Sequence, residues 1–559
     1  MNKIKYISVS ALSILHQTIT HFTGNNIFTA EPSSNIIDYT ICKICALIAS
    51  WLIYYLLWQL FIDKNGIIRE KNRQYNLVSR ICIAALPYLF VMIFVCAFKL
   101  RGGYLSNDEY LIYENAVNLT HYTWFYYITT YYYIISLMIL PHMYAPIFIK
   151  LIIEYLIIGY TMIRSSDYFY SKCSEPLIKK PVKIGYGAFI MILFLLYPVI
   201  AYTTSAHRLP IYFLVYLLMI VILLFDKLEQ RYISIGRLMF LLFLGSVLTQ
   251  WRTEGIYLVV LLPILVYITY PYITIKIPRY NNRDKKSDAG SVNKPSLFTY
   301  EKKSINLKQT KIFPIVLIIY ILLQYLVSIP QNGLVAKELA AAADDRMKPF
   351  YAYTITNMYR NGLDLKKNAD DLAIVDKYLS LEKIKTINDY YKDINYEDVL
   401  ILYKPEFIGV RETAGVTEYY DFANALKRIF KNNPNILIRT RIGAFVYAAL
   451  PYHITFNGFD IRSLITFFVS IIKTTLYNLF IPLIIMLFIF LYSFVRNRWF
   501  SFFTTGGLLI HWFIVFILAP ASYFKYYFPV YITAYFYLIL IIISGIHNKK
   551  HSAKIKILQ

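Results

Sequence analysis

The sequence predicts an all-α polytopic membrane protein with about 11–13 transmembrane helices and a small, mostly helical extracytoplasmic domain. Two observations lead to this fold class. Of the 559 residues, 58% are hydrophobic and only 16% are charged, which is far from the composition of a soluble domain. In addition, apolar runs close to the roughly 20 residues that cross a bilayer recur along the whole chain.

The apolar runs define the expected spans. The first run, MNKIKYISVSALSILHQTITHF, is diluted by His16, Gln17 and His21, so we expect residues 1–25 to form a weak first span or a signal anchor. Clearer spans are expected at 37–61, 81–98, 145–163, 184–202, 208–226, 235–250, 254–275, 312–329, 463–492, 499–519 and 526–544.

The distribution of charge sets the expected orientation. The net charge of +24 does not indicate a nucleic-acid partner, because the Lys and Arg residues collect in the short loops between spans. Such loops are typically cytoplasmic. The hydrophilic stretch 331–434 has nearly equal numbers of acidic and basic residues, so we expect it outside. The basic loops can all be cytoplasmic, with 331–434 outside, only if the aromatic run 124–140 does not cross the membrane fully. We therefore expect 124–140 to be re-entrant or interfacial.

The chain therefore divides into blocks. Two helices broken at Asn433-Pro434 are expected over 421–450, and AKELAAAADDRM (336–347) is a strong helix former. The expected blocks are an N-terminal transmembrane block at 1–275 with an outward acidic loop at 99–123, a basic cytoplasmic linker at 276–311, a transmembrane helix at 312–329, an extracytoplasmic helical domain at 330–462, and a C-terminal transmembrane block with a basic tail at 463–559.

The acidic loop is the first candidate site. The stretch GGYLSNDEYLIYENA (102–116) places Asp108 and Glu109 at the end of a span, with Arg101 and His121 nearby. Ionisable residues at membrane segments are costly, so they are functional candidates. A carboxylate here could be a general base toward a hydroxyl group, or Asp108 and Glu109 could hold a divalent cation such as Mg²⁺ or Mn²⁺. A solvated loop that merely ends the span is the alternative.

Three cationic turns are expected on the same side as the acidic loop. TQWRTEGIY (249–257) carries Arg252 and Glu254, where the guanidinium could clamp a phosphate and the carboxylate could orient it. The other two are TSAHRLP (204–210), with His207 and Arg208, and APASYFKYYFPVYI (519–532), with Lys525. Cations that bind a phosphate leaving group, beside a carboxylate that activates an alcohol, are what group transfer from an anionic donor requires. Interfacial anchoring is the simpler reading of Lys525.

Several common site types are not indicated. The five cysteines lie in or beside expected spans, and the pair Cys42 and Cys45 has no second pair of ligands, so neither a disulfide framework nor a zinc site is expected. The sequence contains no GxxxxGK[ST], no GxGxxG after a strand and no HExxH. Nucleotide-driven and zinc-hydrolase functions are therefore not favoured.

The segments PYLFVMIF, GGYLSNDEY and NAVNLTHYT, the R-x-E-G turn and the late KYYFP together resemble multispanning bacterial glycosyltransferases of the GT-C superfamily. The resemblance implies a plasma-membrane enzyme that takes a sugar from a polyprenyl phosphate or diphosphate on the extracytoplasmic face. It implies that Asp108 is the acidic residue that takes part in catalysis, and that Glu109 is the second candidate for this role. It also implies that Arg252 and Lys525 contact the carrier phosphate. Arg208 is a further candidate for binding this phosphate, and the candidates for orienting or binding substrate are Glu254, His121, Arg101 and His207.

We therefore expect inverting transfer of a sugar to a hydroxyl group of a glycan, a glycolipid or a cell-surface polymer, in which Asp108 accepts the proton. Three other classes stay open. An O-antigen or capsule-type polysaccharide polymerase would use two lipid-linked glycans, and a transporter or flippase of lipid-linked sugars would form no covalent product. A non-catalytic assembly protein would tolerate the loss of every outward carboxylate.

Overall fold

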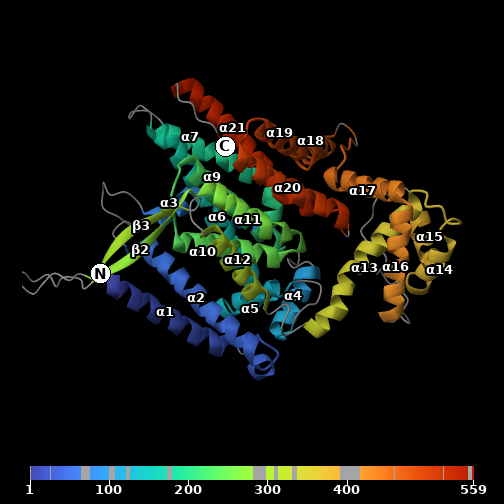
Figure 1. Ribbon diagram of the computed structural model, residues 1–559, viewed down its shortest axis with the longest axis horizontal. Helices are drawn as coiled ribbons and strands as arrows, with labels where there is room; N and C mark the ends of the chain where they lie inside the picture. The colour runs from blue at the N-terminus through green and yellow to red at the C-terminus, as the bar shows by residue number, and fades with distance from the viewer. Residues whose placement is uncertain are drawn as a thin grey trace, which may run out of the picture.

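The computed structural model of the 559-residue chain is a bundle of helices with a small sheet at one end and a group of shorter helices at the other (Figure 1). The ranges that the structure describes are 2–24, 27–63, 76–99, 107–120, 126–172, 179–280, 298–306, 312–329, 336–390, 409, 416–456, 458, 460–519, 521–551 and 557–558.

The first half of the chain is helical up to a β-hairpin. Its elements are α1 (Asn2–Gly24), η1 (Pro32–Asn35), α2 (Ile36–Phe61), α3 (Leu77–Lys99), α4 (Asn107–Val117), α5 (Tyr127–Ile139), α6 (Ala145–Ser171), α7 (Lys179–Leu195), α8 (Tyr197–Thr203), α9 (Leu209–Leu228), β1 (Ile233–Ser234), α10 (Ile235–Trp251), η3 (Thr253–Tyr257), α11 (Leu258–Thr269), β2 (Tyr272–Tyr280) and β3 (Phe298–Asn306).

The second half begins with one apolar helix, continues through a polar helical segment and ends in further apolar helices. Its elements are α12 (Ile312–Ile329), α13 (Ala336–Arg360), α14 (Ala369–Tyr378), α15 (Leu381–Tyr390), α16 (Val416–Asn432), α17 (Pro434–Ala449), α18 (Ile461–Leu476), α19 (Phe480–Val495), α20 (Trp499–Leu518), η7 (Phe524–Tyr527) and α21 (Phe528–His551).

The protein is a helical multi-pass membrane protein. By length and composition, seven helices in the described ranges could cross a membrane, and an eighth is possible if α7 and α8, which meet at 70°, form one broken span. This number is smaller than the 11–13 spans expected from the sequence. The difference arises because α10, η3 with α11, and α12 are apolar but short, while α1 carries the polar side chains of His16 and Gln17.

Polar residues of α1 form hydrogen bonds inside the bundle. Gln17 Nε2 donates to Ser50 Oγ of α2 at 2.8 Å, and His16 Nε2 lies 2.8 Å from the carbonyl oxygen of Ile139 at the end of α5. A Lys5–Asp63 ion pair of 2.8 Å joins the start of α1 to the end of α2. The helix is therefore an integral part of the bundle and packs along α2 and α5.

Two ends of the bundle can be distinguished. The sheet end contains β1–β3 and the turns beside them, and there Arg80 Nη2 at the start of α3 lies 2.6 Å from Asp167 Oδ1 near the end of α6. The insert end is where α13–α17, which we call the insert, contact the rest of the chain. Figure 1 shows α13–α16 together on the right and the β2–β3 ribbon on the left.

The aromatic helix α5 does not connect the two ends. Because α3 and α6 are antiparallel, residue 99 at the end of α3 and Ala145 at the start of α6 lie at the same end. The chain between them leaves the insert end and returns to it. With 13 residues, α5 is also shorter than the roughly 20 residues that a crossing needs. The re-entrant or interfacial placement of 124–140 stays a prediction, and α5 alone is too short to cross.

The basic linker expected at 276–311 contains strands, which is a departure from the purely helical expectation. The strands β2 and β3 pair antiparallel with Tyr272 opposite Asn306, and β1 pairs with β2 in parallel. The sequence YITIKIPRY alternates Ile with Thr and Lys, which is the period of a strand. This alternation is the signal that an assignment based on apolar runs alone overlooks.

The insert has its own apolar core. The amphipathic helix α16 buries Phe422, Leu426 and Ile429 at helical spacing, and these residues pack with residues of α13 and α14. The break predicted at Asn433-Pro434 is confirmed, because α16 ends at Asn432 and α17 begins at Pro434. Proline is favoured at the first position of a helix because it lacks the amide hydrogen that would be unpaired there.

Candidate functional site

The adjacent carboxylates Asp108 and Glu109 have opposite surroundings because they lie on different faces of α4. Glu109, Ile112 and Ala116 follow helical spacing and are fully buried, while Asp108 is exposed. Both lie in the first turn of the helix, where the helix dipole favours negative charge. The fold therefore separates a buried acid from an exposed acid within one dipeptide.

Glu109 is held by the turn that follows α8. Arg208 Nη1 lies 3.0 Å from Glu109 Oε1, and the backbone amide of Arg208 donates to the same oxygen at 3.3 Å. His207 Nδ1 lies 3.1 Å from Glu109 Oε2. Since the Glu109 side chain is 0% exposed and that of Arg208 is 8% exposed, this is a buried and multiply bonded ion pair.

Lys150 fixes the turn that carries His207 and Arg208. From inside α6, its ammonium donates to the carbonyl oxygen of Thr203 at 2.8 Å and to that of Ser205. A carboxylate oxygen of Glu154, one helical turn further along, lies 3.7 Å from the Lys150 nitrogen. Both side chains are buried, so the Lys150–Glu154 pair positions the turn against α4 from the interior of the bundle.

The Arg252 turn is a tight connection between α10 and α11. Arg252 Nε donates to Glu254 Oε2 at 3.0 Å, and Arg252 Nη2 also pairs with Oε1. Only glycine fits at 255, because a Cβ atom there would lie 2.6 Å from the carbonyl oxygen of Leu248. Burial works against the charged carboxylate of Glu254, but Arg252 outweighs burial and holds the pKa of Glu254 at about 2.

The Lys525 turn brings the acidic and cationic groups into one cluster. The Lys525 ammonium lies 4.7 Å from the ring centroid of Tyr523, and the Arg252 guanidinium lies 5.2 Å from that of Tyr526. Lys525 interacts electrostatically with the carboxylates of Asp108 and Glu109 and with the guanidinium groups of Arg208 and Arg252. Four segments that are far apart in the sequence thus meet at the insert end.

Asp108 differs from the other acids of this cluster. The carboxylates of Glu109 and Glu254 are paired with Arg208 and Arg252, whereas no ion pair of Asp108 occurs within the described ranges. The Asp108 carboxylate interacts electrostatically with Lys525 and with Tyr133, a buried residue of α5. An exposed carboxylate beside a cation is suited to accept a proton from a hydroxyl group while the cation faces a phosphate.

Two expected roles change with this geometry. Glu109, the fallback catalytic residue, is buried and faces Arg208 and His207, so it holds the turn and has no open side toward a substrate. Arg208, expected to bind a donor phosphate, has its side chain buried in the pair with Glu109. The expected candidates Arg101 and His121 lie outside the residues that the structure describes.

The expected divalent cation does not fit the carboxylates that are present. Glu109 directs one oxygen to Arg208 and the other to His207, so Asp108 and Glu109 do not form an oxygen-lined pocket. Across the described residues, there is no group of three or more His, Cys, Asp or Glu that could hold a metal ion.

Sequence reasoning missed the residues that support the cluster. Tyr526 lies between Arg252 and Lys525, and Tyr133 lies behind α4. His511 of α20 interacts electrostatically with Glu254, and its Nε2 lies 3.2 Å from the carbonyl oxygen of Tyr526. Tyrosines are so frequent in this chain that no local pattern singles these out, but His511 is an isolated polar residue in an apolar run and could have been considered.

The insert is attached beside the cluster. Arg441 of α17 donates to the carbonyl oxygens of Phe516 and Ala519 at 2.7 and 3.0 Å, at the end of α20. The hydroxyl groups of Tyr353 and Ser522 are also hydrogen bonded. These contacts lie a few residues before Lys525, so the insert covers the same end of the bundle as the charged cluster. In comparisons with models of protein families, with curated proteins and with solved structures, no match to this chain was found.

Proposed function

We propose that this protein is a membrane glycosyltransferase that moves a sugar from a polyprenyl phosphate or diphosphate carrier to a hydroxyl group of a glycan, a glycolipid or a cell-surface polymer. The observation that carries the proposal is the position of Lys525, close enough to interact electrostatically with both Asp108 and Arg252. A cation near an exposed carboxylate supports the binding of an anionic head group next to a general base.

The distribution of charge supports an extracytoplasmic site. At the insert end, Arg208 and Arg252 are each paired with a glutamate. At the sheet end, the three arginines Arg164, Arg231 and Arg237 share the two acids Asp226 and Glu229. An excess of Lys and Arg marks the cytoplasmic side. The basic residues of the sheet end include Lys227, Arg231, Arg237, Arg496 and Arg498.

In the proposed reaction, the acceptor oxygen attacks the anomeric carbon of the sugar, and the bond from that carbon to the carrier phosphate breaks. The leaving phosphate takes the electron pair and is stabilised by Lys525. Arg252 is bonded to both carboxylate oxygens of Glu254 and so holds the neighbouring turn in place. The hydroxyl proton passes to the carboxylate of Asp108. Attack from the side opposite the phosphate inverts the anomeric centre.

The decisive experiment is an assay of the purified protein in liposomes with lipid-linked sugars, comparing the parent with Asp108→Asn. Asp421→Asn, an exposed carboxylate of the insert, is the matched control. We expect a covalent product from a lipid-linked monosaccharide and an acceptor, and its loss in Asp108→Asn alone. Unchanged turnover in Asp108→Asn would remove the proposed base.

The same assay separates the other function classes. A product that forms only when two lipid-linked glycans are present would identify a polysaccharide polymerase. Movement of the lipid-linked sugar across the bilayer without a new covalent bond would identify a flippase. If neither product nor movement occurs and outward carboxylates can be replaced without phenotype in cells, an assembly role is favoured.

The side of the membrane can be tested separately with a maleimide that does not cross membranes. Cysteines introduced at the exposed positions Glu114 and Thr253 of the insert end should react in intact cells. Cysteines at Arg231 and Arg496 of the sheet end should react only after the cells are opened. Labelling of Glu114→Cys and Thr253→Cys on opposite sides would contradict the single site.

A further inference from the structure

The helix α18 presents a row of apolar side chains to the outside of the molecule. Its only buried residue is Ser470, and none of its apolar side chains joins an apolar core of the described residues. Large apolar residues recur along α18 at spacings of three and four, which place them on one face of the helix. The exposed row consists of Ile461, Ile465, Phe468 and Ile472, which are 78%, 58%, 60% and 53% exposed.

The polar face of α18 lies against the protein. The hydroxyl group of Ser470 accepts a hydrogen bond of 3.2 Å from the backbone amide of Thr455, and Thr474 Oγ1 donates to the carbonyl oxygen of Tyr452 at 3.4 Å. The Lys473 ammonium lies 5.4 Å from the ring centroid of Tyr452. A helix that faces water has the opposite arrangement, so the outer face of α18 is suited to an apolar surrounding.

The insert, which lies at the same end, provides a comparison with a helix that faces water. Its helix α16 buries apolar residues in the core of the insert and exposes charged ones. The exposed charged residues of α16 are Glu418, Asp421, Lys427, Arg428 and Lys431. The helix α17, which leads from the insert back to the bundle, exposes Ile438, Ile442 and Val446 at intervals of four residues. The exposed apolar rows therefore begin where the chain returns from the insert to the bundle.

The combined length of α18 and α19 is greater than a bilayer crossing needs. The two helices form one apolar run of 35 residues, Ile461–Val495, which is interrupted at 477–479. At 1.5 Å per residue, this run is about 52 Å long, whereas the hydrocarbon core of a bilayer is about 30 Å thick. A run that is too long is accommodated by tilting or kinking. The interruption at 477–479 is a place where the run can change direction.

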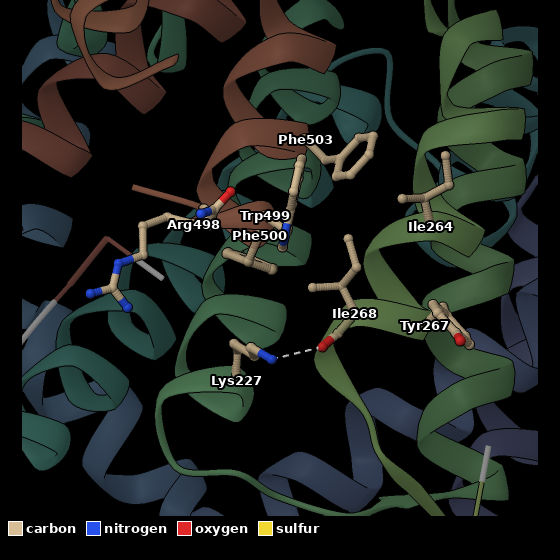
Figure 2. A pocket seen from close by; sticks show the side chains of 9 residues that line it. Lys227, Ile264, Tyr267, Ile268, Arg498, Trp499, Phe500 and Phe503 are labelled. Carbon is tan, nitrogen blue, oxygen red and sulfur yellow. Dashed lines mark hydrogen bonds between the residues drawn. The ribbon is translucent and has the colours of Figure 1, made fainter. Parts of the chain in front are cut away.

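The sheet end shows which part of this run makes the crossing. There α19 ends at Val495, and Arg496, Arg498 and Trp499 follow. Figure 2 shows the Arg498 side chain directed away from the cavity beside Trp499. Arginine and tryptophan at the ends of apolar helices favour the head-group level of a membrane. A crossing of roughly 20 residues that starts at 496 ends near 477, so α18 is the part of the run in excess of one crossing.

We propose that α18 lies obliquely in the lipid leaflet at the insert end, with its apolar row against the acyl chains of phospholipids and its polar face against the bundle. The row continues the lipid-facing surface of α19. The exposed side chains of α19 include Ile481, Ile484, Phe488 and Leu491. Because α18 is the next helix after α17 in the chain, this contact holds the returning end of the insert at the membrane surface.

Photo-cross-linking of the full-length protein in phosphatidylcholine liposomes tests this contact. The photoreactive residue p-benzoylphenylalanine replaces Phe468 or Ile472 in separate variants, and it replaces the exposed Asn424 of α16 in the matched control. Adducts are identified by mass spectrometry. We expect phospholipid adducts at 468 and at 472 and their loss at 424. Because Phe468 and Ile472 are both exposed, neither replacement disturbs a packed core.

Three results would overturn the proposal. Cross-linked dimers at 468 and 472 in place of lipid adducts would show that a second copy of the chain covers the row. Lipid adducts at neither position, or an equal yield at 424, would show that α18 has no specific lipid contact. Phe468→Glu gives a second measurement, because a charge among acyl chains should lower the unfolding midpoint in liposomes, whereas Asn424→Glu should leave it unchanged. A Phe468→Glu midpoint equal to that of the parent would contradict the contact.

Discussion

The two ends of the bundle contain buried acids with different neighbours. At the sheet end, Asp226 is paired with Arg164 and Arg237 and accepts a hydrogen bond of 2.6 Å from Tyr270. At the insert end, Glu109 is paired with Arg208 and His207. Only Glu109 has an exposed carboxylate next to it, that of Asp108, which interacts electrostatically with Lys525 of a distant segment.

This difference teaches that burial and pairing mark the acids that hold the helices together, whereas the exposed acid Asp108 is the one to which the proposed function assigns the reaction. An acid whose oxygens are all bonded to arginine cannot take up a proton without breaking those bonds. The predictions below test this distinction, beginning with the largest expected effect.

Asp108→Asn should lower the turnover of the proposed transfer by about 10²- to 10⁴-fold, which is the usual contribution of a general base. The level of protein in the membrane should stay unchanged because Asp108 is exposed. Asp226→Asn at the sheet end should do the opposite, lowering the thermal unfolding midpoint while the folded fraction keeps its turnover. Turnover is measured in the transfer assay, and the unfolding midpoint is measured by fluorescence. If Asp108→Asn and Asp226→Asn changed turnover and the unfolding midpoint in the same way, the contrast between the exposed and the buried acid would be wrong.

Glu109→Ala should destabilise the folded protein by about 3–5 kcal/mol, because it leaves Arg208 buried without its carboxylate. Unfolding in mixed micelles measures this loss. Glu109→Gln, which keeps the size and hydrogen-bonding capacity of the side chain, should be milder. A stable Glu109→Ala protein that is inactive at saturating substrate would instead make Glu109 the reacting acid.

Lys525→Gln should raise the KM for the lipid-linked donor by about tenfold or more, since a hydrogen bond to a charged group contributes about 1.5–3 kcal/mol. Lys525→Arg keeps the charge and should restore most of the affinity. Arg496→Gln at the sheet end removes the same charge far from the cluster and should leave KM unchanged. If only kcat changes in Lys525→Gln, Lys525 does not bind the ground-state donor.

Glu254→Gln should lower the unfolding midpoint by the same amount at pH 6 and at pH 9. The pKa of Glu254 is held at about 2, below the value near 4.3 of an unfolded glutamate. Its stabilising contribution is thus fully present above the unfolded value and is lost only as the pH falls through about 2. A pH-dependent difference between the variant and the parent in this range would show that the Arg252–Glu254 pair does not persist.

The sequence predicts much of this fold because its strongest signals are local. Apolar runs locate α2, α3, α6, α9, α20 and α21, and the proline at 434 locates the break between α16 and α17. The strands β2 and β3 of the linker were not predicted, because their alternation of apolar and polar residues covers only nine residues each and includes several lysines and arginines. The number of long spans was overestimated, since a short apolar helix such as α11 is surrounded by other helices and need not match the bilayer alone.

The charged residues at the insert end could be selected from the sequence, but their pairing partners could not. Charged turns between apolar runs pointed to Asp108, Arg252 and Lys525, because ionisable residues are rare at such positions. That Glu109 faces inward depends on how α4 rotates against α5 and on the turn at Arg208, which are long-range contacts. A single sequence contains no signal for such contacts, and the pairing partner of each charge therefore had to come from the structure.

The bonds from Arg441 to the last carbonyl oxygens of α20 have a consequence for how the protein can be divided. A helix terminus leaves carbonyl groups without partners, and here a side chain from α17 supplies two of them. Excising α13–α17 would uncap α20 and unwind its final turn, so the peptide leading to Lys525 would lose its anchor. The polar helices therefore support the end of α20, and we expect a truncated chain that lacks them to lose the local structure around Lys525.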